Sequence, residues 1–201
     1  MTSNRMTTHA MVLDGTDREL IESCQRGDRD AFRALFEAHK DRVYSIALRY
    51  SGDEAAAMDI AQDTFLKLFS AIRDFRGTAQ FETWLYRLVA NSCLDRKRRT
   101  RRLIPLVGEM MDVLRASGES VLDRLLRAEL SGRVQSAVKS LPPEQRIVIV
   151  LRYTQGLSYE EIAEVLACSP GTVASRLNRA HKVLERRLAH LARAQGGSHE
   201  Q

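Results

Sequence analysis

Apolar side chains return every three or four residues along most of this chain, and this spacing limits the possible fold more than any other feature. The stripes occupy residues 32–50, 61–72, 81–92, 122–141 and 147–151. The four prolines stand where loops or helix starts are expected: Pro105, Pro142, Pro143 and Pro170. Because residues three and four apart share one face of an α-helix, the chain is predicted to be all-α.

The stripes fall into two groups, separated by a stretch in which Pro105, Gly108 and Gly118 interrupt the helical spacing. Ten of the twelve aromatic residues precede residue 90, so the first group has the heavier core. We therefore expect two small helical domains joined by a flexible linker. The expected boundaries are 1–15 for a disordered tail, 16–99 for the first domain, 100–120 for the linker, 121–192 for the second domain and 193–201 for a second disordered tail.

Composition excludes several classes of protein. No apolar run approaches the roughly 20 residues that span a bilayer, and the N-terminus lacks an apolar signal core, so we expect a cytoplasmic protein without membrane insertion. Three scattered cysteines, Cys24, Cys93 and Cys168, form no zinc or disulfide pattern; they hint at redox sensing or are simply buried. The histidines show no metal-ligand spacing and the acidic residues no catalytic cluster. We expect no enzyme, cofactor or metal.

Charge is distributed in blocks. Residues 1–72 carry nine Lys and Arg against twelve Asp and Glu, whereas residues 73–102 carry nine against three. A second basic block occupies residues 176–187. Such blocks predict a polyanionic partner and a second, basic protein partner. A single basic run would suit a solvated helix face equally well, but two blocks, each ending an apolar stripe, favour nucleic acid.

The sharpest local pattern lies in residues 158–191. Ser158 and Glu161 have the spacing of a capping box that opens a short helix. Ser169 then provides a cap and Pro170 the first residue of a second, basic helix. Two short helices joined by a tight turn are typical of a helix-turn-helix.

The second helix has two faces at ~100° per residue. One face carries an apolar stripe that is expected to be buried: Val173, Leu177, Ala180, Leu184 and Leu188. The opposite face carries side chains that suit a DNA major groove: Ser175, Asn178, Arg179 and Lys182. Arg176 lies beside the apolar stripe and is assigned to packing or to a phosphate contact. The alternative is a helical hairpin with a solvated basic face.

Two parts of the chain resemble a known family. Residues 141–184, LPPEQRIVIVLRYTQGLSYEEIAEVLACSPGTVASRLNRAHKVL, resemble region 4 of the extracytoplasmic-function (ECF) group of bacterial sigma factors. Residues 59–69, DIAQDTFLKLF, and 75–99, FRGTAQFETWLYRLVANSCLDRKRR, resemble region 2 of that group. The resemblance implies a dissociable specificity subunit of RNA polymerase that promotes transcription initiation at promoter DNA.

The resemblance also implies roles for individual residues. Region 4 would read the −35 element. Region 2 would dock on core RNA polymerase through Asp59, Gln62, Asp63 and Phe65. For the two aspartates, an ordinary exposed acidic face remains the alternative reading. Members of the group are commonly inhibited by an anti-sigma factor, which is therefore an expected partner.

For the −10 element, the family holds a flipped base in a loop that corresponds here to residues 75–80. Phe75 belongs to this loop, although a plain core role is the alternative. The resemblance assigns supporting roles to Lys67, Tyr86 and Asn91. The helical wheel adds Arg87 and Arg98, which share the face of Asn91 away from the apolar stripe.

A free-standing helix-turn-helix transcriptional regulator is the alternative function. It would share residues 158–191 but would lack the block at residues 59–69. A pull-down with core polymerase distinguishes the two, because a regulator should not bind that enzyme stoichiometrically.

Overall fold

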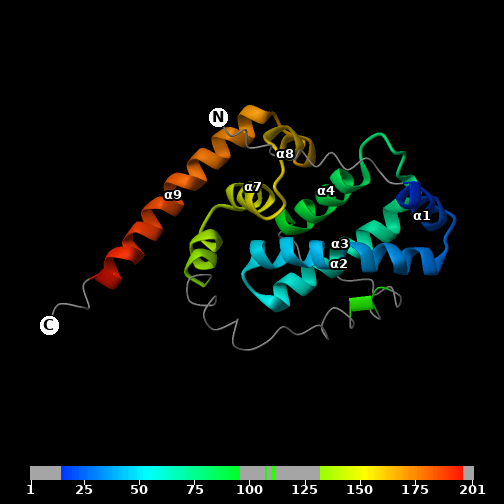
Figure 1. Cartoon of the computed structure of the whole chain (residues 1–201), viewed down its shortest axis with the longest axis horizontal. Helices are drawn as coiled ribbons and strands as arrows, with labels where there is room; N and C mark the ends of the chain where they lie inside the picture. Colours follow the sequence, from blue (N-terminus) through cyan, green and yellow to red (C-terminus); the bar gives the residue numbers. More distant parts are fainter. Residues whose placement is uncertain (1–14, 96–106, 108–109, 112–131, 197–201) are drawn as a thin grey trace, which may run out of the picture.

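The computed structural model describes residues 15–95, 107, 110–111 and 132–196 (Figure 1). All regular elements in these ranges are helices, and the described residues contain no strand. The all-α prediction is confirmed. None of the described helices combines the length and apolar character that crossing a membrane requires.

The first half is built from five helical elements. They are α1 (Gly15–Gln25), α2 (Arg29–Ser51), α3 (Glu54–Ala71), the 3-10 helix η1 (Ile72–Asp74) and α4 (Phe81–Leu94). The Asp28 carboxylate starts α2 by accepting hydrogen bonds from the backbone N–H groups of Asp30 (2.9 Å) and Ala31 (3.1 Å). Gly52 ends α2 at φ +66°, a left-handed conformation that favours glycine.

Aromatic side chains hold α2 against α3. The rings of Phe36 and Phe65 lie 4.5 Å apart, and those of Phe32 and Phe69 meet edge to face at 4.8 Å. Thr64 is also fully buried there, and its hydroxyl donates to the Ile60 carbonyl at 2.8 Å within α3. The aromatic-rich core predicted for the first half is therefore present.

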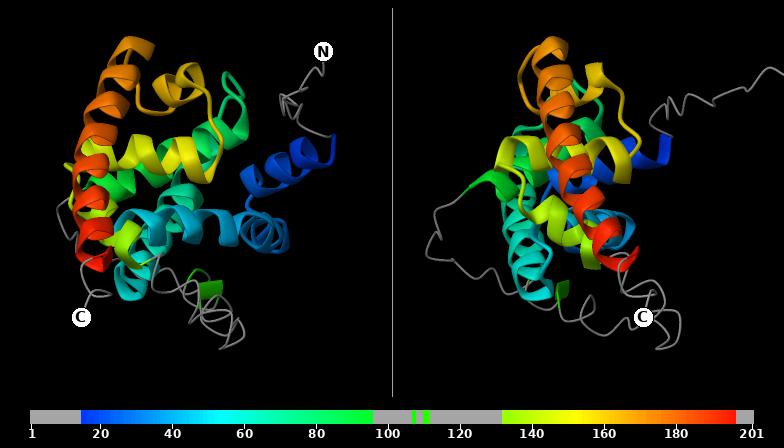
Figure 2. Two further views of the ribbon diagram at one scale, coloured as in Figure 1. Left: turned by 60° about the vertical axis from the view of Figure 1, so that its left-hand side comes forward. Right: turned by 90° about the vertical axis from the view of Figure 1, so that its left-hand side faces the viewer.

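The second half begins, within the described residues, with a helical segment at 132–139. It continues with α7 (Pro143–Thr154), α8 (Tyr159–Val165) and α9 (Pro170–Gly196). Helix α9 projects away from the rest of the molecule along its C-terminal part (Figure 1), and Figure 2 gives two further views of the arrangement. It reaches Gly196, so residues 193–196, expected in a disordered tail, are helical.

The two halves are in contact. Helix α2 packs against α7, and α4 packs against α7 and α8. The Gln135 amide donates to the Arg49 carbonyl at 2.6 Å, and the Arg146 guanidinium donates to the Tyr50 carbonyl at 3.3 Å. Arg146 also lies over the Tyr50 ring, 5.0 Å from its centre. Buried residues of both halves therefore form one hydrophobic cluster.

Part of the predicted linker belongs to this cluster. Val107, Met110 and Met111 are helical and buried. The flexible linker expected at residues 100–120 stays a prediction, and these three positions show that some of its apolar side chains are buried. The remaining linker residues lie outside the described ranges.

Candidate nucleic-acid and protein interfaces

Helices α8 and α9 form the predicted helix-turn-helix. The Ser158 hydroxyl accepts from the Glu161 N–H at 3.1 Å, and the Glu161 carboxylate accepts from the Ser158 N–H at 2.7 Å, which completes the capping box. Ser169 caps α9 by accepting from the Thr172 N–H at 3.1 Å. Between the helices, Ala167 adopts φ +49°, a left-handed turn conformation that is rare for a residue with a Cβ.

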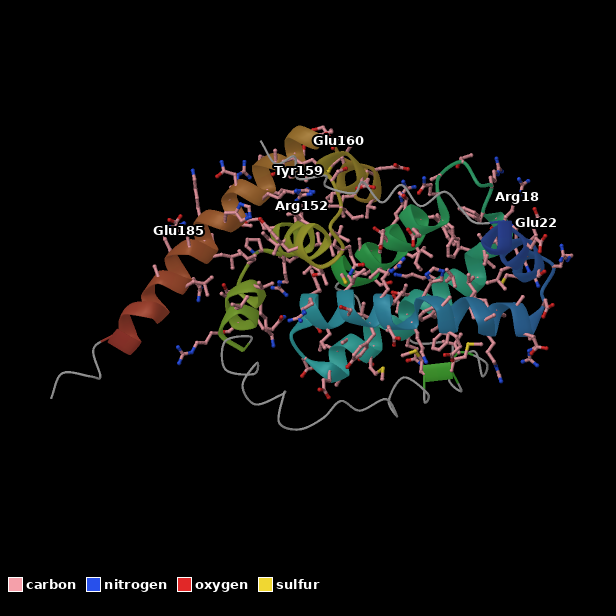
Figure 3. All side chains as sticks on the ribbon, viewed as in Figure 1. Arg18, Glu22, Arg152, Tyr159, Glu160 and Glu185 are labelled. Atoms are coloured by element: carbon pink, nitrogen blue, oxygen red, sulfur yellow. The ribbon has the colours of Figure 1, made fainter. Side chains whose placement is uncertain are left out.

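Arg152 and Tyr159 join α7 to the helix-turn-helix, and both are labelled in Figure 3. Arg152 lies in the last turn of α7, and Tyr159 is the first residue of α8. The Arg152 guanidinium lies over the Tyr159 ring, 5.6 Å from its centre. The same group donates to the Leu157 carbonyl at 2.8 Å. These contacts orient α8 relative to α7 across a four-residue connection that contains Gly156.

Helix α9 presents the polar face that the sequence predicts. Val173, Leu177 and Ala180 of the apolar stripe are buried, and α9 packs against α7 and α8. Further along the helix, Leu184 and Leu188 are only half-buried. Asn178, Arg179 and Lys182 are exposed. Because α9 has buried one face, these long side chains are directed to solvent.

Ser175 and Arg176 differ from those three residues. The Ser175 side chain is half-buried, and its hydroxyl donates to the Thr172 carbonyl at 2.9 Å within the helix. Arg176 is 22% exposed, forms an ion pair with Glu144 of α7 and approaches the Cys168 sulfur at 3.9 Å. Its packing role fits the sequence-based assignment.

A cleft joins this face to the first half. It is lined by Leu94 at the end of α4, by the start of α7 and by Arg176 and Arg179 of α9. The basic run 96–102 begins just beyond Leu94, outside the described residues, and includes the predicted DNA contact Arg98.

Two residues predicted to contact the −10 element touch the second half instead. Tyr86 is only 7% exposed and its hydroxyl donates to the Gln155 side-chain oxygen at 3.2 Å; burial raises the pKa of this phenol. Arg87 donates to the Glu164 carbonyl at 3.0 Å. The Arg87 Nε is buried without a hydrogen-bond partner in the described structure, so this contact satisfies the guanidinium incompletely.

Lys67 stands in a polar network at the junction of α3 and α4. Its ammonium group lies 2.8 Å from the Asp63 carboxylate, 3.5 Å from that of Asp95 and 3.1 Å from the Ser92 hydroxyl. Asn91 lies near this network on α4 and is exposed. Lys67, a predicted DNA contact, therefore forms an ion pair with Asp63, a predicted polymerase contact.

Phe75 is half-buried at the start of the loop 75–80. Its ring lies 5.0 Å from that of Trp84 and meets Phe81 edge to face at 5.7 Å. The structure therefore places Phe75 in an aromatic cluster at the border of the core. Gln25, which the sequence did not single out, donates to the Phe75 carbonyl at 2.7 Å. A lone glutamine at a helix end carries no signal that would reveal this.

The acidic face of α3 exposes part of Asp59, Gln62 and Asp63. Phe65 does not belong to it: this side chain is 0% exposed and packs on Phe36. The prediction that Phe65 contacts polymerase is wrong for the described structure, because its place in the apolar stripe of α3 directs the ring into the core.

The cysteines Cys24 and Cys93 are unsuited to redox sensing. Burial raises the pKa of the Cys24 thiol to about 11 and that of Cys93 to about 12, which suppresses the reactive thiolate. Cys168, in the turn of the helix-turn-helix, is partly exposed. Among the described residues, no group of three or more His, Cys, Asp and Glu could hold a metal ion.

Comparison with known proteins agrees with this division into two units. Residues 35–103 match the family model described as Sigma-70 region 2, and residues 131–184 match the model described as Sigma-70, region 4. The chain is 33% identical over 191 residues to the RNA polymerase sigma-H factor of Pseudomonas aeruginosa, covering 91% of this chain and 99% of the relative. It is 34% identical over 182 residues to the ECF RNA polymerase sigma factor SigW of Bacillus subtilis, covering 87% and 97%.

Solved structures give the same result. The structure of CnrH in complex with the cytosolic domain of CnrY aligns with a TM-score of 0.61 at 30% identity, covering 87% of this chain and 97% of that one. The sigma factor RpoE of Bartonella quintana, solved with the anti-sigma factor NepR, aligns with a TM-score of 0.56. At 24% identity over 79% of this chain and 96% of that one, the second match supports the fold alone.

Proposed function

The chain belongs to the ECF group of sigma-70 factors, and on this premise we propose that it binds core RNA polymerase, recognises −35 and −10 promoter elements and promotes transcription initiation. In this proposal residues 16–99 form region 2 and residues 121–192 form region 4. The polymerase supplies the catalysis and this chain supplies promoter specificity, an activity that belongs to the cytoplasm. The match of the first half to region 2 favours this function over a free-standing regulator.

The exposed polar face of α9 carries the proposal. Asn178 has the amide geometry that reads adenine, and Arg179 the fork that reads guanine in a major groove. Lys182, one turn further on, suits a base edge or a phosphate. We assign Ser175 and Arg176 to the flank of this contact, where Arg176 forms an ion pair with Glu144 and would contact a phosphate. Together these five residues would bind the −35 element.

The −10 contact is assigned to the loop 75–80 and the polar face of α4. Extruding a base from the stack costs a few kcal/mol, so a pocket and a basic surface must hold the separated strand. The half-buried ring of Phe75 would border that pocket. The other residues assigned to this contact are Lys67, Tyr86, Arg87, Asn91 and Arg98.

This assignment requires an exchange of contacts. Tyr86 and Arg87 bond to Gln155 and Glu164 of the second half. For these side chains to reach a DNA strand, the second half must leave α4. The incomplete hydrogen bonding of Arg87 lowers the cost of this exchange.

Polymerase docking is assigned to the partly exposed acidic face of Asp59, Gln62 and Asp63. The two aspartates are four residues apart, so they lie on one side of α3 and suit a basic partner surface. An anti-sigma factor is the further partner that we propose, since members of the group are commonly inhibited by one and the structural relative CnrH was solved with a second protein, the cytosolic domain of CnrY. It would act by covering the same surfaces.

Run-off transcription tests the proposal directly. The purified chain, core polymerase and a randomised promoter library should yield transcripts from promoters that share two elements. A core-polymerase pull-down in parallel should recover the chain stoichiometrically. Binding to DNA without binding to polymerase would instead identify a free-standing regulator.

A further inference from the structure

The last residue of α1 reaches across to the loop assigned to the −10 element. The Gln25 side-chain amide donates to the Phe75 carbonyl at 2.7 Å and to the Ile72 carbonyl at 3.2 Å. These two carbonyls lie at the start of η1 and at the first residue of the loop 75–80. One neutral amide therefore joins both ends of the turn that leads into the loop.

The end of α1 is itself fixed on η1. Ile21 and Cys24 on α1 and Ile72 on η1 are buried in the same cluster. Gly27, which follows the helix at φ +90°, lies close enough to Arg73 that an added Cβ would be 3.5 Å from its guanidinium. The Gln25 backbone consequently has a set position relative to the turn.

Few other interactions of the described residues fix the shape of the loop 75–80. Within the turn, the Phe75 N–H donates to the Ile72 carbonyl at 3.1 Å. Beyond it, Gly77 adopts φ +67°, and Gln80 precedes α4 without a side-chain capping hydrogen bond. The ring of Phe75 is anchored on Trp84 and Phe81, so the direction of the backbone at Phe75 controls where the loop begins.

We propose that Gln25 is a positioning residue for the −10 loop: its amide holds the Ile72 and Phe75 carbonyls so that the loop is shaped before the flipped base arrives. The inference rests on the proposed function, which assigns the base to residues 75–80. A side chain with N–H donors is required, because both partners are carbonyl oxygens and a carboxylate or thioether would have nothing to donate. Preorganisation of a site strengthens binding by lowering the ordering cost.

The test uses the full chain with core polymerase on promoters taken from the library. Gln25→Met keeps the length and helix propensity of the side chain and removes its donors, whereas Gln25→Lys keeps a donor. Arg26→Ala is the matched control, because Arg26 is exposed and bonds to Ser23 within α1 at 2.8 Å. For the −10 element, transcription is compared between promoters with preferred and with changed bases, on both duplex and pre-melted templates. The same comparison is made for changed bases in the −35 element.

We expect Gln25→Met, which removes both hydrogen bonds of the amide, to reduce discrimination among −10 bases roughly three- to tenfold. This is about the effect of one hydrogen bond, because only part of the loss is transmitted to the pocket. The reduction should persist on pre-melted templates, because it arises in the pocket and not in strand separation. Discrimination in the −35 element should stay unchanged, which a general loss of folding would not produce. Gln25→Lys should lie closer to the wild type than Gln25→Met, and Arg26→Ala should match the wild type.

Phe75→Ala separates the inference from its premise. If Phe75→Ala alters −10 discrimination and Gln25→Met does not, the positioning role is refuted and the proposed function survives. If neither variant alters it, the assignment of the −10 contact to this loop fails, and the role of Gln25 fails with it. Equal losses at both promoter elements in Gln25→Met would also refute a positioning role.

Discussion

Arg146 is the polar residue whose removal should weaken the contact between the halves most. Its guanidinium donates to the carbonyls of Tyr50 (3.3 Å), Leu141 (2.9 Å) and Lys139. It also lies over the Tyr50 ring and close to the C-terminus of α2, where a cation is favoured by the helix dipole. We therefore consider the substitution Arg146→Met, which keeps much of the apolar stem.

The magnitude follows from these contacts. Hydrogen bonds from a charged donor contribute about 1.5–3 kcal/mol each, but carbonyls near the surface recover part of this from water. The contact with the Tyr50 ring adds about 0.5–1 kcal/mol. Because the three carbonyls share one group, their contributions are not additive, and we expect Arg146→Met to lower the free energy of unfolding by about 2–4 kcal/mol.

Urea denaturation followed by circular dichroism measures this change. Arg186→Met is the matched control, because Arg186 is exposed on α9 and its guanidinium bonds within that helix; its effect should stay within about 0.5 kcal/mol. Arg146→Lys should recover only part of the loss, since one ammonium cannot reproduce the planar fork. A loss below about 1 kcal/mol for Arg146→Met would refute the reasoning that this residue joins the halves.

Three further outcomes are expected. Arg179→Ala should cost about 1–3 kcal/mol at one base pair of the −35 element in promoter titrations, and an equal loss on all promoter variants would reduce the contact to a phosphate. Asp63→Lys should weaken polymerase binding in a direct titration and leave the thermal midpoint nearly unchanged, although it loses the ion pair with Lys67; unchanged affinity would remove Asp63 from the docking surface. In thiol labelling at pH 8, Cys93 should react at least a hundredfold more slowly than Cys168, because a pKa of about 12 leaves about one thiolate in ten thousand, and its rate should rise with pH. Rapid labelling of Cys93 in the folded chain would contradict its burial.

Much of the local structure could be predicted from the sequence. The capping box of Ser158 and Glu161, the Ser169 cap and the buried stripe of Val173 and Leu177 are as expected. These features depend on residues within about four positions of each other, so the spacing of residue types is enough to specify them. The two-motif resemblance was likewise sufficient to identify the family, which the comparisons confirm.

Phe65 was predicted to lie on a surface but belongs to the core, and two methionines of the predicted linker are buried as well. The family motif suggested Phe65 as a docking residue, although its spacing from Ala61 and Leu68 already placed it in an apolar stripe, and the ring is buried. Met110 and Met111 lie in a stretch without helical spacing, and the residues that bury them are distant in sequence. The burial of the two methionines is decided by which surfaces the fold brings together, whereas that of Phe65 follows from its helical spacing.

The sequence alone was enough to predict the helices, the caps of α8 and α9, the polar face of α9 and membership of the family. Short-range hydrogen bonds and side-chain periodicity encode the local features among these. The packing of one half on the other came from the tertiary structure. The Gln25 amide meets carbonyls 47 and 50 residues away, and Tyr86 meets Gln155 at a separation of 69. Backbone carbonyls exist at every position, so no residue pattern marks which one a distant amide or guanidinium will reach. That choice is made only when folded helices bring the two groups within about 3 Å of each other.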